Sequence, residues 1–467
     1  MTESRPRPQH LDPTAQMGRS PVGRLMVQFS LPPIIGMLVN AFYNVVDRIF
    51  VGQGIGEMGI AGVTISFPIV MTMVSFSILV GVGANTLFAI RMGEGKRDEA
   101  ERILGNALAF LFGFPLFASI AGLAWLEPLL RLLGCSTELM AYAKPYARII
   151  LFGIAINTTG HGLTHFIRSD GHPRLSMVSQ LIGGVANTLL DPLFIFVFRW
   201  GTAGAAWATV IAQTLSFLWC VAYFLSPRAT TRIRRRNLRP AWRQIVFPFL
   251  AIGFSPFTMN LCNSLLNAIL NRSLQHHGGD RAVAVMGILS AFMSIVFMPV
   301  FGMTQGVQPL MGYNYGARHF ARVRKFFRLA LAAATAVLSL GCLASQLFPA
   351  AIVRMFARGD GTLVADGVHA LHVFTALFPT IGVPIVAGTL FQALGKAVHA
   401  GVLALSRQLL FFIPLILLFG RLWGLTGVYA AAPASDFLAF ALALVLLRRF
   451  FRRLREEEAA GLPPAAG

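Results

Sequence analysis

The chain has 467 residues, of which 55% are hydrophobic and 12% are charged, and its formal net charge is +20 at pH 7. An ordinary soluble domain carries about 25% charged residues, so this composition excludes a soluble globular protein. Apolar runs of roughly 20 residues recur along the whole chain, and each is long enough to cross a bilayer core of ~30 Å as a helix. The sequence therefore predicts an all-α integral membrane protein.

Twelve apolar runs are long enough to be transmembrane helices. The first six are 25–51, 60–90, 103–125, 141–166, 173–198 and 203–225, and the second six are 245–270, 282–306, 326–348, 368–394, 397–419 and 425–447. They predict an N-lobe over 25–225 and a C-lobe over 245–447. We expect polar tails at 1–24 and 448–467, an Arg-rich linker at 226–244, and no cleaved signal peptide because no apolar run precedes the first span.

The positive charge is unevenly distributed between the loops. Most of the 39 Lys and Arg residues fall in the termini and the even-numbered loops. By the positive-inside rule this predicts a multi-pass protein of the inner (plasma) membrane with both termini in the cytoplasm. The charge is thus explained without nucleic acid as a partner. The four cysteines share no regular spacing, so neither a disulfide framework nor a metal site is expected.

The two halves of the chain repeat one another. Shifting the sequence by about half its length aligns Pro33 with Pro256, Asn40 with Asn263, Asn44 with Asn267, Gly83 with Gly306, and Gly93 with Gly316. A repeat that contains six spans returns each helix to its original direction, so the two six-helix lobes are predicted to be related by a parallel repeat. Substrate sites in such proteins usually lie between the halves.

Three of the 19 acidic residues fall inside predicted spans: Asp47, Asp191 and Asp436. A carboxylate at the centre of a membrane helix costs roughly 2.5–3.5 kcal/mol on insertion scales, so each is a candidate functional residue. Asp436 follows Pro433 on the last span. It is expected either to anchor a second ion or substrate, or to form a local bond near the proline.

Polar side chains accompany the first acid. Asn40, Asn44 and Asp47 are spaced i, i+4, i+7 and therefore form one stripe along the first span. On the fifth span, Asn187 and Asp191 are again one helical turn apart. These spacings place each acid beside amide groups on its own helix.

The sixth span carries Thr209 at a depth similar to that of Asp47 and Asp191, in the outer half of the membrane. This matched depth predicts one shared cation site with Asn187. Paired carboxylates with amide and hydroxyl oxygens can coordinate Na⁺, or can share a proton because two nearby anions cannot both ionise cheaply. The aligned positions of the second half are apolar or proline, so the site is expected in the N-lobe alone.

Several stretches of the chain resemble the multidrug and toxic compound extrusion (MATE) family. They are Phe29-Ser-Leu-Pro-Pro with Asn44-Val-Val-Asp, Asn187-Thr-Leu-Leu-Asp-Pro, Gly204-Ala-Ala-Trp-Ala-Thr, and Gly306-Val-Gln-Pro-Leu-Met-Gly-Tyr-Asn-Tyr-Gly-Ala. The last stretch is the most specific. The short spacing and Pro433-Ala-Ser-Asp are similar to the MepA-like bacterial branch.

The resemblance implies a two-lobed, V-shaped bundle that alternates between outward and inward openings. It also implies antiport, in which H⁺ or Na⁺ enters as an organic, cationic, amphipathic compound leaves, with no cofactor and with the protein as a monomer. By motif, Asp47, Asn187, Asp191 and Thr209 match the family's N-lobe ion site, and Pro32 matches the bend in the first helix. Because spans 245–270 and 368–394 contain no Asp or Glu, a C-lobe ion site is not expected.

Flexible and aromatic side chains on the second and eighth spans are candidates for an adaptable substrate cavity, because Met and Phe accommodate varied ligands. The candidate cavity residues are Phe67, Met71, Met293, Met303, Gln305 and Gln308. With acids in an otherwise apolar interior, selectivity is expected to be broad and to favour apolar cations.

Two other functions compete with drug export. A flippase for lipid-linked oligosaccharides, from the same superfamily, needs a basic central cavity, and few basic residues fall inside the predicted spans. An intramembrane enzyme needs a nucleophile and a base, and the sequence offers no such pair. The glycines of a GxGxxG match at 54–59 follow no strand, and His161 and His165 lack the acid of a metalloprotease motif, so neither nucleotide nor metal binding is expected.

Overall fold

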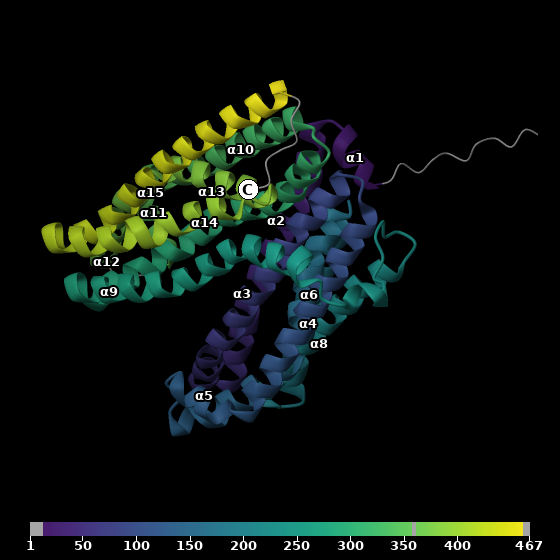
Figure 1. The fold of residues 1–467 in the computed structure, drawn as a ribbon. Coiled ribbons are helices and arrows are strands. Elements are labelled where there is room, and N and C mark those ends of the chain that lie inside the picture. The colour runs from purple at the N-terminus through teal and green to yellow at the C-terminus, as the bar shows by residue number, and fades with distance from the viewer. Residues whose placement is uncertain (1–12, 357–360, 461–467) are drawn as a thin grey trace, which may run out of the picture.

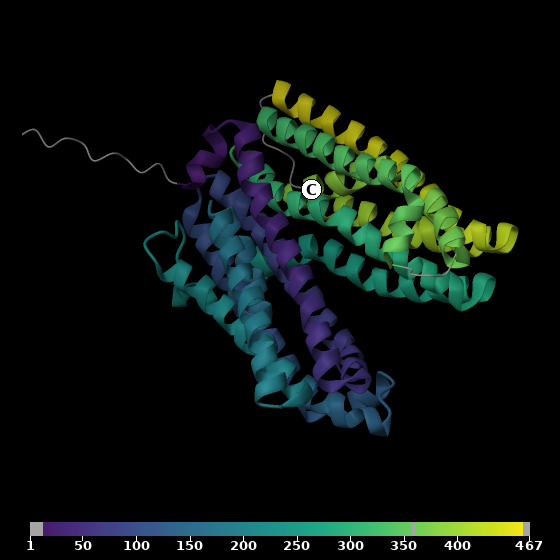
Figure 2. The same ribbon diagram turned by 180° about the vertical axis from the view of Figure 1, so that it is seen from behind.

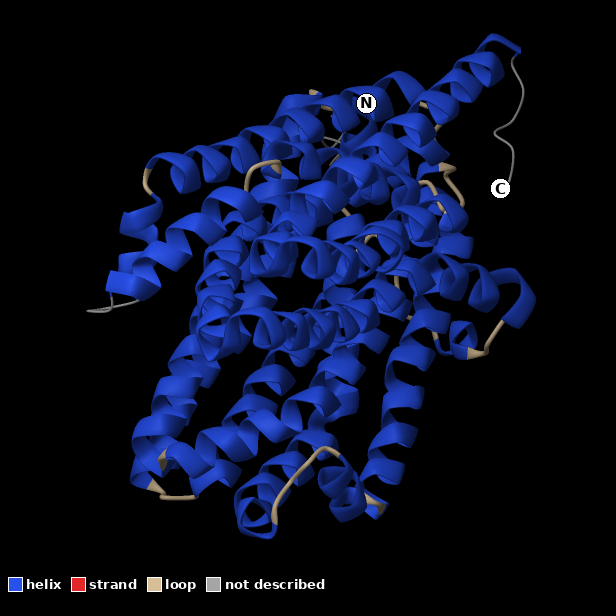
Figure 3. Cartoon of the chain, turned by 90° about the vertical axis from the view of Figure 1, so that its left-hand side faces the viewer, coloured by secondary structure: helices blue, strands red, loops and turns tan. Residues whose placement is uncertain are grey.

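The computed structural model describes residues 13–356 and 361–460, and its regular elements there are all helices (Figure 3). The elements of the N-terminal half are α1 (Pro13–Arg19), α2 (Val22–Ile55), α3 (Glu57–Gly93), α4 (Arg97–Ala124), α5 (Leu126–Leu132), α6 (Thr137–Ser169), α7 (Pro173–Pro192), the π-helix η1 (Leu193–Val197) and α8 (Gly201–Leu225). The linker contains η2 (Arg235–Leu238) and η3 (Trp242–Val246). The N-terminal half therefore supplies six long helices, as predicted.

The C-terminal half contains longer elements that reverse direction. They are α9 (Phe247–Gly316), α10 (Phe320–Leu347), α11 (Pro349–Phe356), α12 (Gly361–Phe374), α13 (Phe378–Ala393), α14 (Ala397–Leu405), η4 (Ser406–Phe412) and α15 (Ile413–Ala460). A straight helix of 70 residues would be ~105 Å long, far more than a membrane can hold. Instead, α9 turns at Gly279 and α15 turns at Gly424, where φ is 61° and 58°, a conformation that glycine adopts without strain.

These turns account for the number of spans. Nine helical segments of the described chain are long and apolar enough to cross a membrane, or ten when α12 and α13, which meet at 53°, are taken as one bent span. Two of these segments, α9 and the run from α14 through α15, are each divided by such a turn into two lengths that can each span the membrane. The prediction of twelve spans in two lobes of six is confirmed.

The two halves form a V (Figures 1 and 2). They meet near α1 and the linker, and they diverge toward α5 in one half and the turn of α9 in the other. The divergent ends are external in the orientation predicted from the basic loops. The helix bounds differ from the sequence prediction at both tails, because α1 forms within 1–24 and α15 continues beyond 447 to Ala460.

Glycines aligned by the repeat lie where the two halves touch. A Cβ atom on Gly83 of α3 would stand 2.0 Å from the backbone oxygen of Phe249, at the start of α9. A Cβ atom on Gly306 of α9 would stand 2.1 Å from the backbone oxygen of Phe29, near the start of α2. The second helix of each half thus packs without a side chain against the first helix of the other.

A second aligned pair makes a reciprocal crossing at the C-terminal ends of α3 and α9. A Cβ on Gly93 would lie 2.0 Å from the oxygen of Tyr313, and a Cβ on Gly316 would lie 2.1 Å from that of Ile90. Side chains near the start of the first helix of each half also pack into the other half. Phe29 of α2 belongs to the hydrophobic core of the C-terminal half, and Phe249 of α9 belongs to a core of the N-terminal half. This reciprocity is what a parallel repeat requires.

The Arg-rich linker is attached to the N-terminal half by a buried acid. Asp170, directly after α6, accepts hydrogen bonds from Tyr223, from the backbone of Thr230 and from Thr231. Burial raises the pKa of Asp170 to about 7, although these donors act in the opposite direction. A second acid, Glu101, forms an ion pair with Arg234 at 3.0 Å. The basic linker is therefore folded against the lobe.

Candidate ion and substrate site

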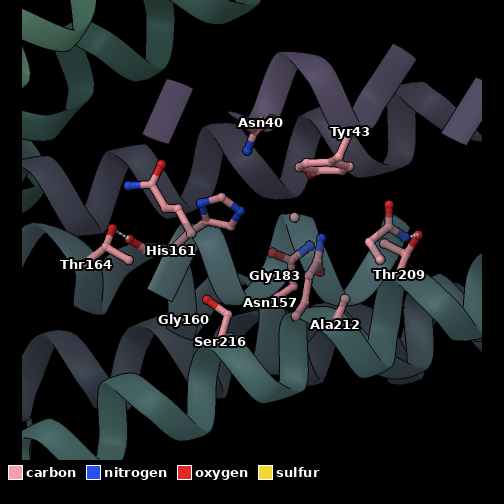
Figure 4. Close-up of a pocket in the computed structure, with 14 residues that line it drawn as sticks. Asn40, Tyr43, Asn157, Gly160, His161, Thr164, Gly183, Thr209, Ala212 and Ser216 are labelled. Atoms are coloured by element: carbon pink, nitrogen blue, oxygen red, sulfur yellow. Dashed lines mark hydrogen bonds between the residues drawn. The ribbon is translucent and has the colours of Figure 1, made fainter. Parts of the chain in front are cut away.

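Three helices of the N-terminal half bring the predicted ion-site residues together. Asn187 on α7 donates from Nδ2 to Oδ1 of Asp191 at 3.3 Å. It also donates to Oγ1 of Thr209 on α8 at 3.4 Å (Figure 4). The carboxyl group of Asp47 on α2 lies close enough to that of Asp191 for the two charges to affect each other. The sequence prediction that these four residues lie together agrees with this geometry, while their role in ion coupling stays a prediction.

The site has more oxygen acceptors than hydrogen-bond donors. Asp191 and Asn187 are buried, and Asp47 is partly buried. Oδ1 of Asp47, Oδ1 of Asn187 and Oδ2 of Asp191 have no hydrogen-bond partner among the described residues. A buried acceptor without a donor is costly, and two adjacent carboxylates repel. A proton or a small cation between these oxygens would relieve both costs.

A local irregularity of the helix follows the acid. Pro192 comes directly after Asp191, and the chain continues as the π-helix η1 rather than as an α-helix. Proline removes one backbone donor, and single π-turns inside α-helices often mark functional sites. The structure thus interrupts α7 next to its buried carboxylate.

A small cavity of about 40 Å³ lies beside Asn187 and Thr209 of this site (Figure 4). Tyr43 and Asn157 line it together with Asn187 and Thr209. Tyr43 lies on the same helix as Asp47, one turn before it, so its spacing carried a signal that our sequence interpretation missed. Asn157 stands alone on α6 and gave no such signal.

The polar stripe of the first helix faces inward. Asn44 donates from Nδ2 to Oδ1 of Asn40 at 2.9 Å, and both residues line a larger cavity between the two halves. Asn40 also lines the small cavity, so the two spaces adjoin. Pro32 lies inside α2, which runs without interruption from Val22 to Ile55.

The larger space, here called the central cavity, has a volume of about 670 Å³. Of the predicted substrate-cavity residues, Gln305 and Gln308 line it. The others are not among its lining residues: Phe67 and Met71 are exposed on α3, Met293 packs against the core of the C-terminal half, and Met303 is buried in that core. Helical spacing identified the right helices for these four residues but not which side chains face the cavity.

Asp436 has a different partner from the two that we expected. It is buried, and its Oδ1 lies 2.7 Å from Nε of Arg407 on η4. Its neighbour Ser435 donates to the backbone of Ala432. Neither sequence interpretation included this pairing with an arginine 29 residues earlier in the chain. A role of Asp436 as an ion or substrate anchor stays a prediction.

Basic side chains lie in the interior where the sequence indicated few. Arg168, His161 and His165 of α6 all line the central cavity. Arg168 lies just past 166, where the predicted span ended, and was therefore assigned to a loop. The helix continues to Ser169, so this guanidinium lies within a described helix.

Replacing Thr209 by Ala is expected to weaken ion coupling without abolishing it. The change removes one acceptor for Asn187, worth about 1 kcal/mol, so the ion concentration that gives half-maximal efflux should rise about fivefold. The rise should be larger for Na⁺, which needs the oxygen as a ligand. Thr214→Ala is the matched control, because Thr214 bonds only to the backbone of its own helix. An unchanged ion dependence of Thr209→Ala would remove this residue from the site.

Two six-helix membrane lobes with a cavity between them and a pair of neighbouring acids in one lobe define a polytopic membrane transporter. The chain belongs to the MatE family, whose family model matches it twice, over residues 32–193 and 257–418. The two matches fall one in each half, as the repeat predicts. Proteins of this family are secondary transporters and not enzymes. This confirms the resemblance to the MATE family, and it confirms that the chain is not an intramembrane enzyme.

Known relatives cover nearly the whole chain. The multidrug export protein MepA of Staphylococcus aureus (strain N315) is 24% identical over 429 residues, which are 92% of this chain and 94% of the relative. MepA of Staphylococcus haemolyticus is 22% identical over 441 residues, with 94% and 96% covered. The resemblance to the MepA-like branch is thus confirmed.

Solved structures share the fold. A multidrug resistance MATE family transporter of the MOP superfamily in an outward-facing conformation superposes with a TM-score of 0.88 and 24% identity, covering 94% of this chain and 98% of that one. A MOP superfamily transporter from Pyrococcus furiosus, whose binding pocket of reverse polarity suggests a different function, gives a TM-score of 0.87 and 24% identity, with 95% and 98% covered.

Proposed function

We propose that the protein is a cation-coupled antiporter of the plasma (inner) membrane that exports organic, mostly cationic and amphipathic compounds by alternating access. H⁺ or Na⁺ enters as the compound leaves, and both termini face the cytoplasm. The observation that supports the ion coupling is the group of three buried oxygens at Asp47, Asn187 and Asp191 that have no donor in the described part of the chain. The names of the MepA relatives support multidrug export.

The adjoining cavities suggest how the two fluxes are coupled. Both the small cavity beside Asn187 and Thr209 and the central cavity are lined by Asn40, His161, Thr164 and Gln180. When an ion binds, the negative charge at Asp47 and Asp191 is neutralised, so their attraction for a cationic compound in the cavity is lost. Release of the ion on the cytoplasmic side restores that attraction. If the ion stabilises one arrangement of the lobes and the compound stabilises the other, the transporter exchanges the ion for the compound across the membrane.

Cells that express the protein are expected to tolerate and exclude a panel of quaternary ammonium compounds and cationic dyes better than cells that express Asp191→Asn at the same level. Dye accumulation should be several-fold lower with the wild-type chain, because export opposes entry. The measurement is fluorescence per cell, with and without an uncoupler of ion gradients. Equal accumulation in both strains would contradict cation export.

A specific observation keeps the lipid-linked oligosaccharide flippase as a second candidate. Arg168 lies in the central cavity, which meets the requirement for a basic group that the sequence did not. Anionic lipid carriers need such a group, whereas simple organic cations do not. Failure of the cation panel, together with translocation of a lipid-linked pyrophosphate in vesicles, would favour the flippase.

A further inference from the structure

Arg168 is a buried charge that the proposed cation coupling does not use. It lies one residue before the end of α6, is 2% exposed, and lines the central cavity. A guanidinium stays ionised in proteins, so its burial must be compensated by partners. Charged groups inside membrane helices mark binding sites or pathways unless they are paired.

The protein itself offers Arg168 no counter-charge among the described residues. Nη1 donates to Oε1 of Gln305 at 2.9 Å, and Nη2 donates to Nδ1 of His165 at 2.9 Å. None of the ion pairs in the described chain includes Arg168. By contrast Arg407, which is only partly buried, is paired with Asp436. A guanidinium has five donors, so three remain for a ligand.

The hydrogen bond also fixes the state of His165. Because arginine only donates, Nδ1 of His165 accepts, and the proton of the neutral ring is on Nε2. His165 is therefore a further donor beside Arg168. His161, His165 and Arg168 are spaced i, i+4, i+7 and line the same cavity from one face of α6, and no Asp or Glu is among the residues that line it. This end of the cavity has donors and a positive charge.

The location joins the two lobes. Gln305 belongs to α9 of the C-terminal half, and its Nε2 also contacts Sδ of Met37 on α2 at 3.6 Å. The bond between Arg168 and Gln305 therefore crosses from one half to the other near the closed end of the V. A ligand that binds Arg168 contacts both lobes and competes for this bond.

We propose that Arg168, with His165 and Gln305, forms an anion-binding site in the central cavity, and that the exported compound carries a carboxylate or phosphate group that binds there. This proposal rests on the proposed export function and deepens it. The acidic group of the compound pairs bidentately with the guanidinium, and its basic group lies toward the small cavity, beyond which the acids of the N-lobe attract it. Amphipaths that carry both charges are then better ligands than simple cations. The same chemistry could be supplied by the phosphate of a lipid headgroup.

A pair of dyes that differ by one charge tests the proposal. Rhodamine B has a free carboxylate, and its ethyl ester lacks it while keeping the cationic ring system. Binding of both dyes to the purified full-length protein is measured by fluorescence polarisation for the wild type, Arg168→Gln and Arg168→Lys. Arg148→Gln is the matched control, since Arg148 lies on the same helix but is exposed.

The wild type should bind rhodamine B more tightly than the ester. Arg168→Gln should weaken rhodamine B about tenfold or more, because a charge-assisted pair is lost, and should change the affinity for the ester less than twofold. Arg168→Lys should retain part of the preference for rhodamine B over its ester, and Arg148→Gln should retain all of it. Wild-type protein that binds the acid no better than the ester would overturn the proposal. Equal weakening of both dyes in Arg168→Gln would also overturn it, since that result indicates a structural tether between the lobes.

Repeating the measurement in bilayers separates the two sources of the anion. In nanodiscs of phosphatidylcholine alone, rhodamine B should bind with the same affinity as it does to the purified protein in detergent. If added phosphatidylglycerol weakens rhodamine B binding to the wild type but not the residual binding to Arg168→Gln, an anionic lipid headgroup occupies the same site. No effect of the lipid supports the exported compound as the occupant. Because binding is measured without ion gradients, its outcome is independent of whether transport is ion-driven.

Discussion

Asp47→Asn and Asp191→Asn are each expected to reduce ion-driven efflux to background while leaving expression and folding intact. Asparagine preserves the volume of the side chain but removes the titratable charge. The two carboxyl groups are neighbours, and each has an oxygen without a hydrogen-bond donor among the described residues, so a single amide donor is accommodated without breaking a bond. The second half has no duplicate, because it has Leu270 and Pro414 at the aligned positions.

Efflux from energised vesicles at matched expression measures this effect. Asp98→Asn is the control, since Asp98 is exposed near the start of α4, and it should transport as the wild type does. Wild-type efflux from both the Asp47 and Asp191 variants would show that coupling occurs elsewhere. Asp436 would then be tested, with Arg407 replaced at the same time because the two are paired.

Gly83→Val is expected to have the second large effect, on the assembly of the lobes. Even a Cβ atom at this position would lie 2.0 Å from the backbone oxygen of Phe249, and backbone cannot rotate aside as a side chain can. Overpacking against side chains typically costs about 1–3 kcal/mol, and a clash with backbone should reach or exceed that range. The variant should therefore show a lower melting temperature and little transport.

Gly113→Ala provides the comparison. A Cβ there meets nothing within 4 Å, and its φ is ordinary, so alanine should be neutral or slightly stabilising in α4. Melting of the purified proteins, followed by size-exclusion chromatography, measures both changes. A Gly83→Val variant with the melting temperature and efflux of the wild type would mean that the halves separate at this contact more easily than the packing indicates.

Much of the fold could be predicted from the sequence, because membrane helices must satisfy their own backbone and therefore appear as long apolar runs. The parallel repeat was predictable for a related reason. Gly83 and Gly306 serve the same function in the two halves, namely to let one helix backbone approach another, and no other residue type does so at these distances. These glycines therefore appeared as identical residues when the two halves of the sequence were aligned.

The acid site could also be predicted, since Asp47, Asn187 and Asp191 are polar residues in apolar surroundings, and helical spacing fixes which of them share a face. The remaining features depend on tertiary packing. The pairing of Asp436 with Arg407 joins two helices, and nothing in the sequence around either residue indicates the partner.

The position of Arg168 was missed for a different physical reason. Hydropathy ends a span at the first charged residue, yet α6 continues past 166 to Ser169 within the protein interior. Met303 illustrates the converse error, because a flexible apolar side chain on a cavity-lining helix can equally pack into the core behind it. Periodicity identifies a helical face only when its polar residues are numerous.

The most direct test of ion-coupled export uses proteoliposomes that contain the purified protein and a fluorescent cationic dye. Dye efflux is measured under a proton gradient alone and under a Na⁺ gradient alone, with the wild type and Asp191→Asn side by side. We expect one of the two gradients to drive efflux of the wild type and neither to drive efflux of Asp191→Asn. Efflux of the wild type that is independent of both gradients, or that persists in Asp191→Asn, would contradict ion-coupled export through the N-lobe site.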